Sequence, residues 1–169
     1  STCKKISKKQ LVGFVGRPVI AKGYNLFVEL SEQIHNHNIS FFQCGIKPEK
    51  KLKNDKIINL GYLDKSKLLK KLLESKIIIN MSKSKKHWEE VFGISIVEAI
   101  ITGNYILCTR SPGTIFLKRV YTNFIFFIDN NKKLSEQLNE LMQNREVKSL
   151  PKNYFSSLTI SKRWKRVLS

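Results

Sequence analysis

Residues 89–99 read Glu-Glu-Val-Phe-Gly-Ile-Ser-Ile-Val-Glu-Ala, and the rest of the chain is organised around this stretch. Gly93 interrupts regular structure, which predicts that Glu90 lies in a loop and that a helix follows over 94–102. At helical spacing, apolar side chains cover most of this helix and leave one polar strip that contains Glu98. A helix with so much apolar surface is usually buried, so its carboxylate must be paired, hydrogen-bonded or facing a cleft.

Spacing alone leaves two interpretations of this stretch open. In the first, the N–H groups and the positive dipole end beside Gly93 bind a phosphate, and Glu98 binds a ligand with hydroxyl groups. In the second, the helix belongs to the core and Glu98 lies at its solvated edge, since carboxylates in such positions mark functional sites in only some proteins.

Apolar runs alternate with helical spacings along the rest of the chain. Strands are expected over 11–16, 39–44, 56–60, 76–80, 105–108 and 124–128. Helices are expected over 24–37, 64–75 with Asp64 as N-cap, 94–102 and 132–144, with a short helix after a turn at 111–114 and a closing helix over 154–168. Apolar strands alternating with helices predict an α/β fold, a Rossmann-like doubly wound parallel sheet whose ligand lies beyond the carboxyl ends of the strands.

Length and cysteine usage set the broad class. The 169 residues can enclose a hydrophobic core as one domain, with a basic lead-in or linker remnant over 1–10 and the domain itself over 11–169. Cys3, Cys44 and Cys108 are far apart and lack C-x-x-C spacing. This pattern fits a reducing cytosol better than a disulfide framework or a zinc site.

The formal net charge of +18 predicts attraction to polyanions, either nucleic acid or an anionic membrane surface. We favour a bias of composition, with some attraction to a membrane surface, over nucleic acid as a partner, because the lysines are spread along the chain and no nucleic-acid-binding signature accompanies them. Residues 13–16 read Gly-Phe-Val-Gly, so the first strand lacks the G-x-G-x-x-G fingerprint of a nicotinamide-dependent dehydrogenase.

Four short motifs occur in a recognisable order. They are Gly16-Arg17 with Lys22-Gly23 after the first strand, Gly61-Tyr62-Leu63-Asp64 after the third, the Glu-x-Phe-Gly-x-x-x-x-Glu-Ala pattern of 90–99, and Gly103. In this order they resemble the C-terminal, donor-binding half of a GT-B glycosyltransferase. The family that they resemble is the retaining, family-4-type glycosyl transferases group 1, which includes many bacterial lipopolysaccharide and capsule enzymes.

The resemblance implies a hexosyltransferase type of activity and assigns roles to these motifs. Arg17 and Lys22 would bind the donor diphosphate and stabilise it as a leaving group. Glu98 would accept hydrogen bonds from the ribose, and Glu90 would lie against the transferred sugar, which makes Arg17, Lys22 and Glu90 the expected catalytic residues. The expected donor-binding residues are Gly16, Arg17, Lys22, Tyr62, Glu90, Phe92, Gly93, Ile94, Ser95 and Glu98.

The resemblance also implies the substrates and partners. The donor would be a UDP-, GDP- or ADP-sugar with no cofactor and no metal, and His35, His37 and His87 lack the carboxylate spacing of a metal site. The acceptor would be lipid-linked or a polysaccharide, and the protein would be cytoplasmic, peripheral at the inner face of the cell membrane. The N-terminal acceptor domain of a GT-B enzyme is expected to be absent, which would leave an inactive donor-binding fragment.

Two positions depart from the family pattern. Met81-Ser82 stands where the family commonly has Pro-Ser, and Gly113-Thr114 replaces a Gly-Gly pair. Leu117 then occupies the place of a glutamate that lies near the sugar. Two further hypotheses follow: a degenerate domain that keeps the fold without binding a donor, and a non-catalytic basic Rossmann-like module that binds nucleic acid.

Overall fold

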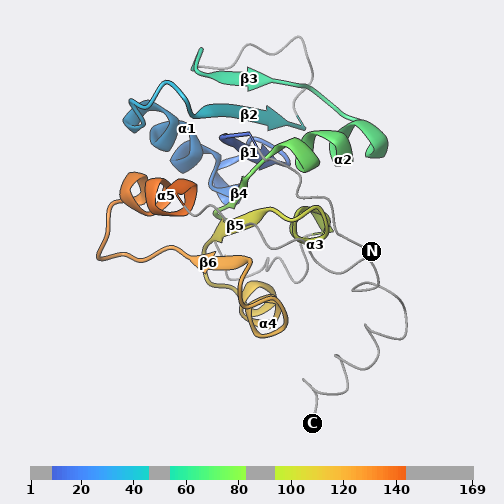
Figure 1. Ribbon diagram of the computed structural model, residues 1–169, viewed down its shortest axis with the longest axis vertical. Helices are drawn as coiled ribbons and strands as arrows, with labels where there is room; N and C mark the ends of the chain where they lie inside the picture. Colours follow the sequence, from blue (N-terminus) through green and yellow to red (C-terminus); the bar gives the residue numbers. More distant parts are fainter. Residues whose placement is uncertain (1–8, 46–53, 83–93, 144–169) are drawn as a thin grey trace.

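The computed structural model describes residues 9–45, 54–82 and 94–143, which form a six-stranded parallel sheet with helices on both faces (Figure 1). The strands are β1 (Leu11–Val15), β2 (Ser40–Cys44), β3 (Ile57–Asn59), β4 (Ile77–Asn80), β5 (Tyr105–Cys108) and β6 (Ile125–Phe127). The helices are α1 (Tyr24–Gln33), α2 (Lys65–Glu74), α3 (Ile94–Ile101), α4 (Pro112–Val120) and α5 (Leu134–Gln143), with a short 3-10 helix, η1 (Ile20–Lys22), before α1. The predicted α/β fold is confirmed.

The sheet has the strand order β3-β2-β1-β4-β5-β6. From β1 the chain moves outward to β2 and β3, and it then returns to the other side of β1 and continues outward through β4, β5 and β6. The direction reverses between β1 and β4, so the two loops that follow these strands leave the sheet toward opposite faces. Doubly wound sheets bind their ligands in the crevice that such a reversal opens at the carboxyl edge.

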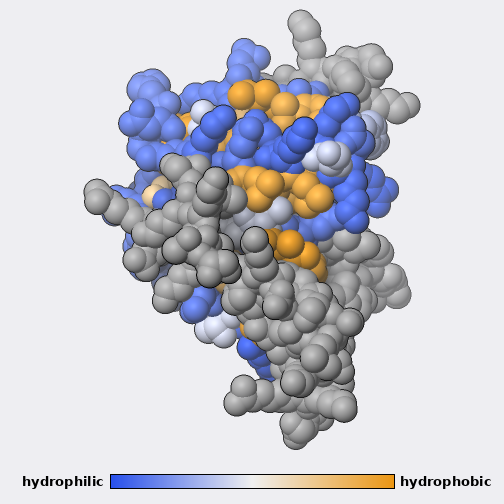
Figure 2. All heavy atoms as spheres, turned by 45° about the vertical axis from the view of Figure 1, so that its right-hand side comes forward, coloured by the Kyte–Doolittle hydropathy of each residue, from blue (hydrophilic) through white to orange (hydrophobic). Residues whose placement is uncertain are grey.

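The strands are mostly apolar because each face of the sheet is covered by helices. Alternate side chains, such as Val12, Phe14, Ile77 and Ile79, pack on the side of α1 and α5. The intervening ones, such as Phe42, Ile78 and Ile106, pack on the side of α2, α3 and α4. Figure 1 shows these two helical layers on opposite sides of the sheet. The coloured part of the face in Figure 2 is hydrophilic with apolar stretches in between. No described helix is long and apolar enough to cross a membrane.

Side-chain caps fix where two of the helices begin. Asp64 accepts a hydrogen bond from the backbone N–H of Lys67 at 2.8 Å, which confirms the predicted N-cap of α2. Ser111 caps α4 in the same way, with Pro112 as the first helical residue, and Thr114 completes a reciprocal capping box. The prediction of a separate turn at 111–114 before the helix is therefore wrong, because these residues form the N-cap and the first turn of α4.

Two further helices differ from their predicted form. The helix expected over 24–37 ends at Gln33, because Asn36 accepts a hydrogen bond from the N–H of Asn38 and turns the chain into β2. Helix α3 is buried on one side only, and Ile101 is 44% exposed. The expected closing helix over 154–168, and the lead-in except for residues 9 and 10, lie outside the described residues.

Candidate functional site at the carboxyl edge

All six strands are parallel, so the loops that follow them leave the sheet at one edge. Backbone hydrogen bonds join the ends of the strands on one side of this edge. The N–H of Gly16 donates to the carbonyl of Cys44 at 3.0 Å, and the N–H of Gly45 donates to that of Gly61 at 2.9 Å. The residues that directly follow β1, β2 and β3 therefore form one connected rim, and this rim carries two of the predicted donor-binding residues, Gly16 and Tyr62.

Gly16 has space in front of it. Its φ is +144°, a conformation that side-chain-bearing residues rarely adopt, and a Cβ at this position would meet no heavy atom of the described residues within 4 Å. The backbone at the end of β1 therefore faces an open volume at the switch point. A bulky charged group such as a phosphate can approach the main chain here without meeting a side chain.

The loop from Arg17 to Gly23 leads from β1 into α1 and packs against the end of the neighbouring strand, β4. A Cβ on Gly23 would lie 2.4 Å from both the Cβ and the carbonyl oxygen of Met81, so η1 and the start of α1 are packed directly onto the end of β4. Arg17 is exposed and Lys22 is half-buried. The structure therefore brings both predicted diphosphate-binding cations to the switch point, on a loop held between β1 and β4.

The end of β4 is itself fastened to the end of β5. The hydroxyl of Thr109 donates to the carbonyl of Ser82 at 2.7 Å, and the N–H of Ser82 donates to the side chain of Asn80 at 3.3 Å. Met81 is fully buried among the first set of core residues. Met81-Ser82 stands where the family pattern has Pro-Ser. The backbone at this edge is therefore fixed by the hydrogen bonds of Ser82 with Thr109 and Asn80 rather than by a proline ring.

Helix α3 carries the second carboxylate of the predicted motif. The helix begins at Ile94 after the carboxyl edge and ends at the opposite edge, where the N–H of Asn104 donates to the carbonyl of Ala99. Ser95 and Glu98 are both half-buried and share one side of the helix. At about 1.5 Å per residue, Ser95 lies about 1.5 Å and Glu98 about 6 Å along the helix from its first residue. Glu90, Phe92 and Gly93 lie outside the described residues, as does the side chain of Ile94.

Tyr62 stands at the far end of the rim. The N–H of Gly61 donates to the side chain of Asn59 at 2.9 Å, which fixes the turn after β3, and Asp64 begins α2 directly afterwards. Between these two anchors the ring of Tyr62 is 66% exposed. An exposed ring on a fixed turn can pack against the flat face of a nucleobase.

The position that departs from the family's glutamate belongs to the core. Leu117 is 3% exposed and packs on the inner side of α4 with residues of the α2, α3 and α4 layer. Its side chain fills space between helix and sheet and does not reach the carboxyl edge. The two buried thiols serve the core as well, because burial raises the pKa of Cys44 to about 11 and that of Cys108 to about 12.

Metal-ligating side chains do not gather within the described part of the chain, where no three of His, Cys, Asp and Glu lie close enough to hold an ion. His35 and His37 follow α1 and precede β2, which places them at the edge of the sheet opposite to the candidate site. His87 lies outside the described residues.

Residues that the motifs did not single out also lie at the carboxyl edge. Arg110 follows β5, and its guanidinium lies 4.4 Å from the centre of the Phe127 ring on β6. A cleft of about 590 Å³ opens beside this pair. The sequence places both residues at strand ends, but their contact depends on β5 and β6 being neighbours, which the order of the strands along the chain does not fix.

Comparisons with known proteins agree with this architecture. The sequence pattern of the family described as Glycosyl transferases group 1 matches residues 3–154. A Klebsiella pneumoniae protein, described as an uncharacterized 42.6 kDa protein in the cps region, is 31% identical over 124 residues, which are 70% of this chain and 31% of that protein.

Solved structures share the fold at low sequence identity. TarM superposes with a TM-score of 0.66 at 17% identity over 99% of this chain and 36% of its own, and Anabaena HepE in complex with UDP-glucose superposes with 0.64 at 12% over 96% and 48%. An α-glucosyltransferase bound to UDP-glucose and DNA gives 0.63 at 16% over 95% and 52%. The chain thus spans about a third to a half of the length of these proteins, and it belongs to the glycosyl transferases group 1 family.

Proposed function

We propose that the carboxyl edge between β1 and β4 binds the diphosphate and ribose of a nucleotide sugar. The observation that carries this proposal is the packing of the Arg17–Lys22 loop onto the end of β4 at the switch point, with α3 as the next helix along the chain. Membership of the family and the likeness in fold to HepE, solved with UDP-glucose, support the same function.

The chemistry of the segments matches the parts of such a donor. Arg17 and Lys22 supply positive charge where a diphosphate leaving group gains negative charge. Glu98 accepts hydrogen bonds from ribose hydroxyls on the half-buried side of α3, and Tyr62 covers the base. Glu90, Phe92 and Gly93 complete the proposed site next to the transferred sugar, and retention of the anomeric configuration is part of this proposal.

The acceptor and the setting are also proposals. A relative from a cps region supports a lipid-linked or polysaccharide acceptor in the synthesis of capsule, lipopolysaccharide or a related glycan. The chain covers one Rossmann-like unit, and the acceptor would bind on a second unit, so we expect the 169 residues alone to bind the donor without turning it over. The net charge of +18 supports peripheral attachment to an anionic membrane surface.

Titration of the chain with UDP, GDP, ADP and their common sugar conjugates, followed by saturation-transfer NMR, tests the donor site. Glu98→Gln should weaken the preferred nucleotide roughly tenfold or more, because a charge-assisted hydrogen bond contributes about 1.5–3 kcal/mol. Glu32→Gln, an exposed carboxylate near the end of α1, is the matched control and should leave the affinity unchanged. Equal affinities of these two variants, or no nucleotide binding, would overturn the proposal.

The same charge keeps the nucleic-acid hypothesis as a second candidate. Binding to phosphate backbones releases counterions, so its affinity should fall steeply as salt rises. Binding of a nucleotide in the proposed site should depend on Arg17, Lys22 and Glu98 instead. Tight, salt-sensitive binding to DNA or RNA in the absence of nucleotide binding would favour the second candidate.

A further inference from the structure

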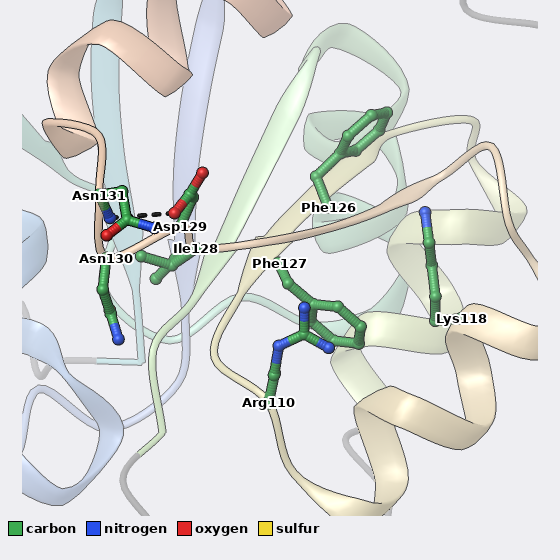
Figure 3. A pocket seen from close by; sticks show the side chains of 8 residues that line it. All are labelled: Arg110, Lys118, Phe126, Phe127, Ile128, Asp129, Asn130 and Asn131. Carbon is green, nitrogen blue, oxygen red and sulfur yellow. Dashed lines mark hydrogen bonds between the residues drawn. The ribbon is translucent and has the colours of Figure 1, made fainter.

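The cleft beside Arg110 is lined by residues that follow β5, by β6 and the turn after it, and by Lys118 of α4 (Figure 3). Its volume of about 590 Å³ falls within the range of pockets that bind small molecules, about 300–1,000 Å³. It lies at the ends of β5 and β6, two strand spacings from the gap between β1 and β4. At about 4.8 Å per spacing this separation is about 10 Å, so the cleft opens on the same edge as the proposed donor site but at a distinct place.

Arg110 presents a fixed cation to this cleft. Its guanidinium stacks on the ring of Phe127 at 4.4 Å, and Figure 3 shows the pair between Lys118 and the turn at Asp129–Asn131. Among the described residues, none accepts a hydrogen bond or forms an ion pair with this guanidinium. Stacking on the ring leaves the N–H groups at the edge of the guanidinium plane available to a carboxylate or a phosphate, which they can bind in a fork.

Lys118 adds a positive charge to the cleft and covers the outer side of β6. Its amino group donates to the carbonyls of Thr122 and Ile125 at 2.6 and 2.5 Å and lies 5.2 Å from the centre of the Phe126 ring. β6 is the last strand of the described sheet, and Lys118 occupies the carbonyl of Ile125 on it, so this wall suits a compact ligand better than an added peptide strand.

The opposite wall is the turn at 129–131, which carries amide groups and one carboxylate and is held in place by hydrogen bonds. The carboxylate of Asp129 accepts a hydrogen bond from the N–H of Asn131 at 2.9 Å, and the side chain of Gln137 binds both backbone groups of Asp129, donating to the carbonyl at 2.8 Å and accepting from the N–H at 2.9 Å. Carboxylate and amide groups on a fixed turn suit hydroxyl groups, which can both donate to Asp129 and accept from Asn130 or Asn131.

We propose that this cleft binds one unit of an anionic saccharide, with its carboxylate or phosphate on Arg110 and its hydroxyl groups on the Asp129–Asn131 turn. A cationic wall on one side and hydrogen-bonding groups on the other match a sugar ring that carries charge at one end. Such a ring could belong to the acceptor glycan or to the transferred sugar of the donor, and the two sources share the chemistry that the cleft recognises.

The test uses three matched probes on the full 169-residue chain: methyl glucuronide, methyl glucoside, and UDP. Backbone amide NMR should show that methyl glucuronide shifts the signals of residues 129–131, whereas the neutral glucoside does not. Arg110→Gln should weaken the glucuronide about tenfold, which is the expected effect of losing a charge-assisted fork. Arg119→Gln removes the same charge from the exposed side of α4 and should have no effect, since Arg119 does not line the cleft.

The remaining arms separate the source of the sugar and the two proposed sites. Glucuronide binding that persists in saturating UDP-glucose assigns the cleft to the acceptor, whereas an Arg110-dependent preference for UDP-glucuronate over UDP-glucose assigns it to the donor sugar. Equal binding of the glucuronide and the glucoside, equal effects of the two arginine variants, or no shift at 129–131 would overturn the proposal. UDP binding is measured in the same samples, so failure of this cleft is distinguishable from failure of the donor site.

Discussion

Gly23→Ala tests the packing that brings the cationic loop to the switch point. Two costs add at this position. A φ of +72° costs an alanine about 1–2 kcal/mol, and a Cβ 2.4 Å from the Cβ and the carbonyl oxygen of Met81 causes overpacking that costs about 1–3 kcal/mol more. Neither contact is the far end of a flexible side chain, so the start of α1 must move away from β4. We expect the free energy of unfolding to fall by about 2–5 kcal/mol.

Gly16→Ala is the matched control for backbone strain. Its φ of +144° is also unfavourable for alanine, but its Cβ would enter open space, so the contact cost is absent. The same open space is where the diphosphate is proposed to lie. Gly16→Ala should therefore keep more of the stability than Gly23→Ala does, yet lose most of its affinity for the nucleotide.

Urea unfolding, monitored by tryptophan fluorescence and circular dichroism, measures the first effect, and nucleotide titration of the folded variants measures the second. A Gly23→Ala variant within about 1 kcal/mol of the native stability would refute the contact between η1 and the end of β4. The argument for a diphosphate in front of β1 would likewise fail if Gly16→Ala bound nucleotide as well as the native chain does.

Two other predictions concern the core. Leu117→Glu restores the glutamate of the family pattern, but position 117 is only 3% exposed, so water would not solvate the carboxylate. We expect the free energy of unfolding in urea to fall by about 3–5 kcal/mol, against less than about 1.5 kcal/mol for the control Leu117→Met. Equal stability of the two variants would show that position 117 reaches solvent. Burial lowers the pKa of Lys76 below its ordinary value of 10.5. At a pH between these two values, Lys76 is more often protonated in the unfolded chain than in the folded one. The free energy of unfolding therefore rises with pH over this window. Lys76→Met lacks this rise, and parallel stability curves for the two proteins over that window would contradict the assignment.

Local chemistry made much of the fold predictable. The strands are mostly apolar runs because both faces of the sheet are covered, and such runs stand out between charged helices and loops. Asp64 indicated the start of α2, because a carboxylate before a helix accepts a hydrogen bond from a free backbone N–H group of the first turn. Ser111 carried the same signal for α4, and the sequence Ser-Pro-Gly-Thr obscured it because it equally suits a turn.

Contacts between distant segments were not predictable in this way. The motif placed Arg17 and Lys22 after β1, but only the strand order places their loop beside Met81. The stacking of Arg110 on Phe127 likewise needs β6 to lie next to β5. Periodicity gives the face of a strand or helix on which a residue lies, whereas the neighbour across that face is set by topology.

The burial of Leu117 bears on whether the donor site is degenerate. Leu117, in the place of the family's glutamate, packs in the core and brings no charge to the carboxyl edge. The nearest strand end, after β5, instead carries Arg110, held toward the cleft by Phe127. The backbone of the rim and the Gly23 contact remain in place beside it. Under the proposed function, the fixed cation at Arg110 would favour a donor site that takes a different, anionic sugar over a degenerate one.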